Sequence, residues 1–215
     1  IKFINFNNKF ILQIFTIFFI LISYSKANDI KDFQIGEMSV KESLLNYFDK
    51  NLIIKELESE FTFFYKNKTY AVITAGNTSQ FDLRINSNIY EDIGITIKPR
   101  DKNYIIYGLS GRIFCEKNIS LCKSKKNEIE KELINFFGKD VNMSKVDANH
   151  AYDKTGNSKT FNTYFSFKSG DYVSISTIDW SDSATNQSGV PFPDNTKVSI
   201  VTSEFDKFLA DVQYK

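Results

Sequence analysis

The chain contains one histidine, His150, and two aspartates, Asp147 and Asp153, lie close to it in the sequence. A hydrolase of the Ser–His–Asp kind needs a base, a carboxylate that orients the base and an activated nucleophile. Serines are abundant, but Gly108-Leu-Ser-Gly111 does not match the G-x-S-x-G pattern that presents a nucleophilic serine. A lone histidine in a polar segment is most often a solvated side chain. We therefore expect no catalytic residues, and the alternative is a secreted hydrolase that uses His150.

A second candidate site surrounds the single tryptophan, Trp180, which follows a predicted strand and is flanked by Asp179 and Asp182. An aromatic face beside carboxylates can stack on a sugar or small molecule and hydrogen-bond to it. We predict Trp180, Asp179 and Asp182 as ligand-binding residues on this basis. These carboxylates could also hold a cation, as could Asp147-x-Asn149. The latter lacks the turn glycine and the closing glutamate of a calcium loop, so we expect no metal site and no cofactor.

The tetrapeptide Asp153-Lys-Thr-Gly156 matches the phosphorylated-aspartate motif of P-type ATPases. That chemistry needs a nucleotide domain, a magnesium site and a membrane pump, and a chain of 215 residues offers none of them. Aspartate, threonine and glycine are also typical turn residues. The motif therefore predicts a turn.

Two cysteines, Cys115 and Cys122, are the only ones in the chain. An even count in an exported protein favours a disulfide. Six intervening residues do not match the C-x-x-C pattern of redox sites, and two thiols alone do not complete a zinc site. We predict a structural disulfide between Cys115 and Cys122, with free thiols as the alternative.

The N-terminal segment 1–27 has the three parts of a secretory signal peptide. Lys2 and Lys9 supply the positive start, an apolar run covers 10–22, and Ser25-Lys-Ala27 places small residues at the −3 and −1 positions of a cleavage site. The run is shorter than the ~20 residues that a spanning helix needs. We expect cleavage, with a retained anchor as the alternative. The protein is then periplasmic or secreted, with no stable membrane span after cleavage.

Helical spacing and cap signals predict the helices. A capping box, Ser39-Val-Lys-Glu42, predicts a helix through Phe48, and a short helical turn follows over 52–57. The strongest helix is predicted over 122–137 with Gly138 placed to end it, and a short final helix begins after a cap at Ser203.

Alternating apolar residues and turn signals predict antiparallel strands between these helices. The predicted segments are 61–65, 69–74, 81–85, 93–97, 104–114, 161–167, 172–179 and 197–202. Gly108 and Gly111 in the longest segment indicate a bulge or a bend over a neighbouring element. The polar stretch 139–159 is predicted to be a flexible loop.

Helices segregated from hairpins indicate the α+β class. We expect antiparallel β meanders with two main helices and a short C-terminal helix, folded as a single α+β domain over 28–215. The halves 33–114 and 119–215 each begin with a helix, so the order also permits two α-β-β repeats.

Composition limits the choice of partner. The basic residues Lys2, Lys9 and Lys26 lie in 1–27, which leaves 24 of the 27 basic residues against 26 acidic ones. A net charge of −2 over 28–215 gives no reason to expect a nucleic acid or an anionic membrane. The partner we expect is an unknown envelope protein or a small molecule.

Several segments together resemble uncharacterised small exported proteins of AT-rich marine alphaproteobacteria. They are 33–48, Tyr104-Ile-Ile-Tyr-Gly-Leu-Ser-Gly-Arg-Ile113, the helix headed by Cys122, and Asp179-Trp-Ser181. More distantly, the Ser43-Leu-Leu45 entry into a helix followed by a strand meander is similar to the small α+β module of the outer-membrane barrel-assembly lipoprotein. The first resemblance implies export without a known activity, and the second implies the fold of that module.

Taken together, these features predict a non-catalytic binding or cell-envelope interaction module. Its alternatives are the hydrolase that uses His150 and a carbohydrate or small-molecule binder that uses Trp180.

Overall fold

The computed structural model describes residues 29–76, 89–184 and 192–213. The expected signal peptide, 1–27, and the expected strand at 81–85 lie outside the described residues.

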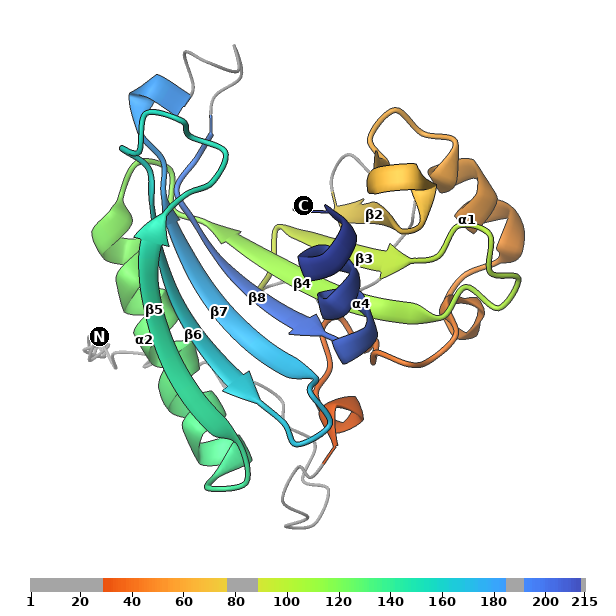
Figure 1. Ribbon diagram of the computed structural model, residues 1–215, viewed down its shortest axis with the longest axis horizontal. Coiled ribbons are helices and arrows are strands. Elements are labelled where there is room, and N and C mark those ends of the chain that lie inside the picture. Colours follow the sequence, from red (N-terminus) through yellow and green to blue (C-terminus); the bar gives the residue numbers. More distant parts are fainter. Residues whose placement is uncertain (1–28, 77–88, 185–191, 214–215) are drawn as a thin grey trace, which may run out of the picture.

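The described strands form one eight-stranded antiparallel sheet in the order β1-β2-β3-β4-β8-β7-β6-β5 (Figure 1). Their bounds are β1 (Phe63–Phe64), β2 (Ala71–Gly76), β3 (Asp92–Ile97), β4 (Ile106–Phe114), β5 (Asn142–Asn149), β6 (Lys159–Ser166), β7 (Tyr172–Asp179) and β8 (Asn195–Val201). Each chain reversal joins neighbouring strands except the passage from β4 to β5, which contains a helix. This arrangement confirms the α+β class and the antiparallel meanders.

The described helices are α1 (Lys50–Leu57), α2 (Ile119–Phe137) and α4 (Ser203–Phe208), with a further helical turn over Leu209–Gln213. Asn118 caps α2, since its side chain accepts a hydrogen bond from the Leu121 amide at 3.1 Å. Gly138 ends α2 at a φ of 62°, a left-handed conformation that glycine adopts without steric cost. The main helix and its glycine stop are therefore confirmed.

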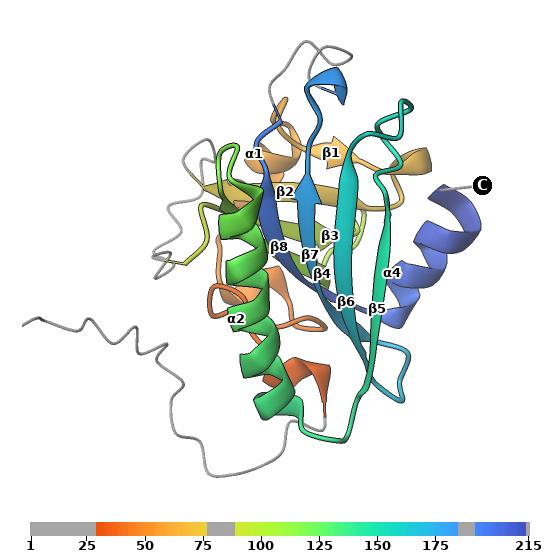
Figure 2. The ribbon, with the colours of Figure 1, turned by 90° about the vertical axis from the view of Figure 1, so that its left-hand side faces the viewer.

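The two faces of the sheet are covered differently. Figure 2 shows α2 on one side of the sheet and α4 on the other. The larger core lies on the α2 side, where Leu133 and Phe137 of α2 pack with apolar residues of the sheet such as Phe165, Val173 and Val198. A smaller cluster lies on the α4 side, where Phe205 packs on Tyr70, Tyr107, Tyr172 and Val201. The sheet therefore has one apolar face and one face that is apolar only beneath α4.

In each half of the domain, the described residues contain a helix followed by four strands, and the second half ends in α4 as well. The half 33–114 contains α1 and β1 to β4, and the half 119–215 contains α2 and β5 to β8. The last strands of the halves, β4 and β8, lie side by side in the middle of the sheet with Gly111 opposite Val198. The two halves thus meet along the antiparallel pair β4 and β8.

The disulfide between Cys115 and Cys122 is present, with a Cα–Cα distance of 5.7 Å. It joins the residue after β4 to the first turn of α2. The Cys122 carbonyl also accepts a hydrogen bond from the Thr196 hydroxyl of β8 at 2.9 Å. The bridge therefore fixes the start of the helix over the middle of the sheet.

The predicted helix after Ser39 is wrong, because only a 3-10 turn over Leu44–Asn46 forms there. Lys41, inside the predicted capping box, has a φ of 69°, which a right-handed helix cannot contain, and the Ser39 hydroxyl donates to the Lys31 carbonyl. The cap of the short turn is Ser43, which accepts from the Leu45 amide. Tertiary contacts of this segment thus replaced its local helical preference. The final helix is likewise capped by Thr202 rather than Ser203.

The predicted flexible loop at 139–159 is also wrong, because it contains β5. β5 lies at the edge of the sheet and all eight of its residues are exposed. A strand with neither face buried has no need for alternating apolar residues, which are the signal by which strands are found in a sequence.

Gly108 and Gly111 of β4 lie at the predicted bulge and at the predicted close approach of a neighbouring element. The β3–β4 register shifts beside Gly108, where Thr96 opposes Gly108 and Ile97 opposes Ile106. A Cβ atom on Gly111 would lie 2.5 Å from the Tyr90 ring, so glycine is required for this ring to pack on the strand.

Candidate functional site

Four rings gather at the end of the sheet where β7 finishes. Trp180 stacks on Phe192, with ring centroids 4.6 Å apart and an angle of 23° between the ring planes. The centroid of the His150 ring lies 4.2 Å from that of Trp180. Tyr152 completes the group with edge contacts to Trp180 and Phe192 at 6.3 and 5.6 Å, and 49% of Tyr152 is exposed. We call His150, Tyr152, Trp180 and Phe192 the aromatic cluster.

A carboxylate at the base of the β5–β6 connection holds this cluster in place. The connection closes through the His150 amide, which donates to the Ser158 carbonyl at 2.9 Å. Inside it, Asp153 is 3% exposed and accepts from the Thr155 hydroxyl at 2.6 Å and from the Ser158 and Ser181 hydroxyls at 2.7 Å each. Ser181 follows Trp180, so Asp153 ties the connection to the end of β7.

Asp153 also accepts from the amides of Thr155 and Ser158, each at 2.9 Å, and Gly156 completes the turn at a φ of 75°. The Asp-Lys-Thr-Gly sequence is therefore a turn, as predicted. Hydrogen bonds from Thr155, Ser158 and Ser181 hold the pKa of Asp153 well below its usual range. The carboxylate stays ionised and acts as an acceptor for its neighbours.

The geometry around His150 does not assemble a Ser–His pair among the described residues. The Nδ1 atom of His150 accepts from the Tyr152 amide at 3.3 Å. The nearby hydroxyls of Ser158 and Ser181 donate to Asp153 instead. A nucleophilic serine needs a base that can take its proton, and an ionised carboxylate with several donors is a poor base. Burial and the positive charge of Lys197 lower the pKa of His150, although Asp153 opposes them.

The three residues predicted to bind a ligand make different contacts in the structure. Trp180 lies in the aromatic cluster, whereas Asp182 pairs with Lys117 at 2.8 Å, both side chains being 84% exposed. Asp179 ends β7 and lies opposite Lys159 of β6.

One buried carboxylate that contacts the Trp180 backbone is a residue that sequence reasoning missed. Asp194 accepts a hydrogen bond from the Trp180 amide at 2.9 Å and is 6% exposed. Burial raises the pKa of Asp194, and the negative charge of Asp179 adds to this effect, whereas the Trp180 amide opposes it. No local pattern marks Asp194, because its partner is distant in the sequence and β8 brings the two together.

The second candidate surface is the sheet face opposite α2. One register row carries Ser110, Ser199, Ser174 and Tyr164 across β4, β8, β7 and β6. We call this surface the serine face; with the next row it comprises Asp92, Ser110, Arg112, Asn162, Tyr164, Ser174, Ser176, Lys197 and Ser199.

The serine face carries fixed charges at one side. Arg112 donates to Asp92 at 2.8 Å, and Lys197 is its neighbour in the same row. Burial lowers the pKa of Lys197, and the positive charge of Arg112 acts in the same direction. Burial raises the pKa of Asp92 in spite of Arg112. The row thus places a guanidinium and an amine beside the hydroxyl of Ser176.

A hollow of about 450 Å³ lies elsewhere, at the far end of β5 and β6. Its lining mixes charges of both signs, including Asp29, Lys41, Lys139 and Lys168. Lys41 is already paired with Asp171 at 2.6 Å. Such a lining favours no single ligand charge.

No three His, Cys, Asp or Glu side chains of the described residues gather as metal ligands would. Within the same residues, no helix has both the length and the apolar character needed to cross a bilayer.

The comparisons with known proteins give no relative. No protein-family model, no curated protein and no solved structure matches this chain.

Proposed function

We propose that this protein is a non-catalytic binding module of the cell envelope and that the serine face recognises a partner protein. The observation that carries the proposal is the asymmetry of the sheet. Its α2 face is filled by the main core, while the opposite face carries rows of hydroxyl, amide and charged side chains from β3 to β6, of which Ser174 and Ser199 are buried and the others part-exposed.

The size and composition of the serine face support this function. The serine face crosses five strands, β3, β4, β8, β7 and β6, which at a spacing of ~4.8 Å gives it a width of about 19 Å. Arg112 and Tyr164 are of the types enriched at binding hot spots. A sheet held on both sides by neighbouring strands is rigid, which lowers the entropy cost of association.

The proposal includes export. The disulfide Cys115–Cys122 suits an oxidising compartment. With the signal-like segment 1–27, it supports a periplasmic or secreted location. The resemblance to exported proteins and to the barrel-assembly lipoprotein module belongs to the same proposal. The mass of the protein purified from its own host tests cleavage after Ala27.

The partner is tested by site-specific photocrosslinking in the native host. A photoreactive residue replaces Ser176 on the serine face or, as the matched control, Lys125 on the outer side of α2. We expect a discrete adduct with one envelope protein from position 176 and none from position 125. Equal adducts from both positions, or none from 176, would contradict the proposal.

A second candidate is binding of a carbohydrate or small molecule, which the aromatic cluster favours. The half-exposed Tyr152 beside the stacked Trp180 and Phe192 offers ring faces and edges to a ligand. Trp180 is the only tryptophan, so its fluorescence reports this cluster alone. An emission change with a glycan or metabolite that is lost in Tyr152→Ala would support the candidate; an unchanged spectrum across the panel would oppose it.

A further inference from the structure

β5 is a long strand with a free edge. It pairs with β6 along all eight residues, and among the described residues it has no other neighbouring strand. Every residue of β5 is exposed, including Met143 and Val146, which are each 49% exposed. A free edge presents backbone donors and acceptors that another strand can satisfy.

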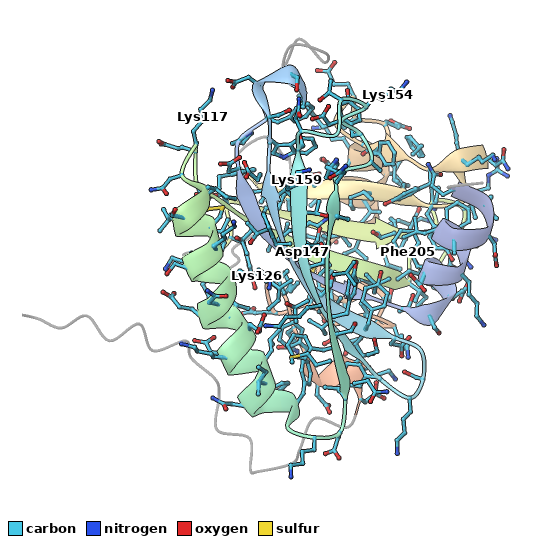
Figure 3. The ribbon with its side chains drawn as sticks, turned by 60° about the vertical axis from the view of Figure 1, so that its left-hand side comes forward. Lys117, Lys126, Asp147, Lys154, Lys159 and Phe205 are labelled. Atoms are coloured by element: carbon cyan, nitrogen blue, oxygen red, sulfur yellow. A yellow bond between two sulfur atoms is a disulfide. The ribbon has the colours of Figure 1, made fainter. Side chains whose placement is uncertain are left out.

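The charges of β5 are arranged about its centre. Lys145 and Asp147 flank Val146 and point to the α2 side, as shown by the hydrogen bond from Lys145 to Glu130 of α2. Lys145 is still 54% exposed. Val146 points to the other side, toward the serine face, where it lies opposite Asn162. Figure 3 labels Asp147 on this outer strand and Lys126 on α2.

We propose that β5 pairs antiparallel with β5 of a second copy of this chain, about a two-fold axis at Val146. This register places Lys145 opposite Asp147 of the second copy, and the symmetry repeats that pair. Val146 faces its own counterpart and provides an apolar contact between the two ion pairs. The two sheets become one continuous sheet, and this inference does not depend on the proposed function.

The neighbouring registers are excluded by like charges. If the two-fold axis is perpendicular to the sheet, residues that oppose each other must point to the same face. The axis must therefore pass through a residue position, and the nearest alternatives to Val146 are Lys145 and Asp147. Centring the axis one residue earlier places Lys145 against Lys145 of the second copy, and centring it one residue later places Asp147 against Asp147. Like charges directly opposite each other destabilise a strand pair, whereas opposite charges stabilise it.

The helices leave room for this pairing. α2 packs on β7 and β8, so its axis lies two to three strand spacings, or about 10–14 Å, from the edge of the sheet. The α2 helices of the two copies are then about 25 Å apart, more than the ~10–12 Å diameter of a helix.

Disulfide trapping tests the register. Directly opposed residues of antiparallel strands have Cα atoms about 4.5–5.5 Å apart, within the span of a disulfide. We expect Val146→Cys to give a covalent dimer on non-reducing gels. Ser144→Cys is the matched control, because Ser144 lies on the same strand and the same face but opposes Ala148 of the second copy. Equal trapping of both variants would overturn the register.

Sedimentation of the unmodified protein tests the dimer itself. We expect a monomer–dimer equilibrium whose Kd rises at least about tenfold in Asp147→Lys, because Lys145 then faces a lysine. Glu60→Lys makes the same charge change at another exposed site and should leave Kd unchanged. Circular dichroism should show both variants folded. A protein that stays monomeric at every concentration, or a dimer whose Kd is unchanged in Asp147→Lys, would overturn the proposal.

Discussion

Lys126 and Glu130 lie one turn apart on α2 and form an ion pair of 3.0 Å beneath the helix, with side chains only 9% and 10% exposed. Thr163 of β6 joins the pair, since its hydroxyl accepts from Lys126 at 2.6 Å and donates to Glu130 at 2.8 Å. Lys145 of β5 also donates to Glu130. This network links α2 to the last two strands of the sheet, of which β5 contributes no residue to the buried core.

Replacing Glu130 with glutamine should destabilise the fold by about 3 kcal/mol at neutral pH, because Lys126 is left buried without its counter-charge. Chemical denaturation measures the free energy of unfolding. The control is Glu128→Gln, whose exposed pair with Lys125 should be worth at most about 0.5 kcal/mol. Equal losses in both variants would contradict the role given to Glu130.

The same carboxylate should make stability depend on pH. Burial alone would raise the pKa of Glu130, but hydrogen bonds from Lys145, Thr163 and Lys126 lower it from 4.5 to about 2. Because the folded pKa lies below the unfolded one, this stabilisation is present above pH 4.5 and is lost as pH falls toward 2. The difference in stability between the wild type and Glu130→Gln should therefore shrink across this window.

Trp180 emission should report protonation of His150, whose ring is 4.2 Å away. Burial and Lys197 lower the pKa of His150 below 6.5, so the emission change should have a midpoint below pH 6.5. The unfolded chain binds this proton at a higher pH than the folded protein does, so the free energy of unfolding should decrease as pH falls below 6.5. A midpoint above 6.5, or an identical titration in His150→Gln, would contradict the assignment.

Removing the disulfide by Cys115→Ser with Cys122→Ser should lower the free energy of unfolding by about 2–3 kcal/mol, because the unfolded chain gains the freedom of a short loop. Thermal unfolding measures the loss. Alkylation of the unreduced wild type followed by mass spectrometry is the companion measurement. Labelling of both cysteines in that experiment would show that the bond is absent.

Gly111→Ala should destabilise the fold by about 1–3 kcal/mol, because the added methyl would lie 2.5 Å from the Tyr90 ring. The matched control is Gly108→Ala in the same strand, whose nearest neighbour, Thr96 Oγ1, is 3.2 Å from the new methyl. Denaturant unfolding should show the larger loss for Gly111→Ala. Equal losses would mean that the Tyr90 contact relaxes freely.

The sequence by itself determined the elements whose residues carry a local signal. Helix 119–137 has an apolar stripe and a glycine stop, and the buried strands alternate or end in turn residues, so both could be predicted. The Cys115–Cys122 bond followed from the count and spacing of the cysteines. These features depend on neighbours within a few residues, which a sequence displays directly.

Tertiary structure alone decided the rest. β5 was missed because an exposed edge strand needs no apolar pattern, and the helix after Ser39 was lost because the amides of Lys41 and Leu44 donate to the distant carbonyls of Ile106 and Tyr104. The surroundings of Trp180 likewise depend on Asp153 and Asp194, which the sheet brings to it from distant segments. Such contacts form only when the strands have found their order, and strand order is set by the packing of the whole core rather than by any local run of residues.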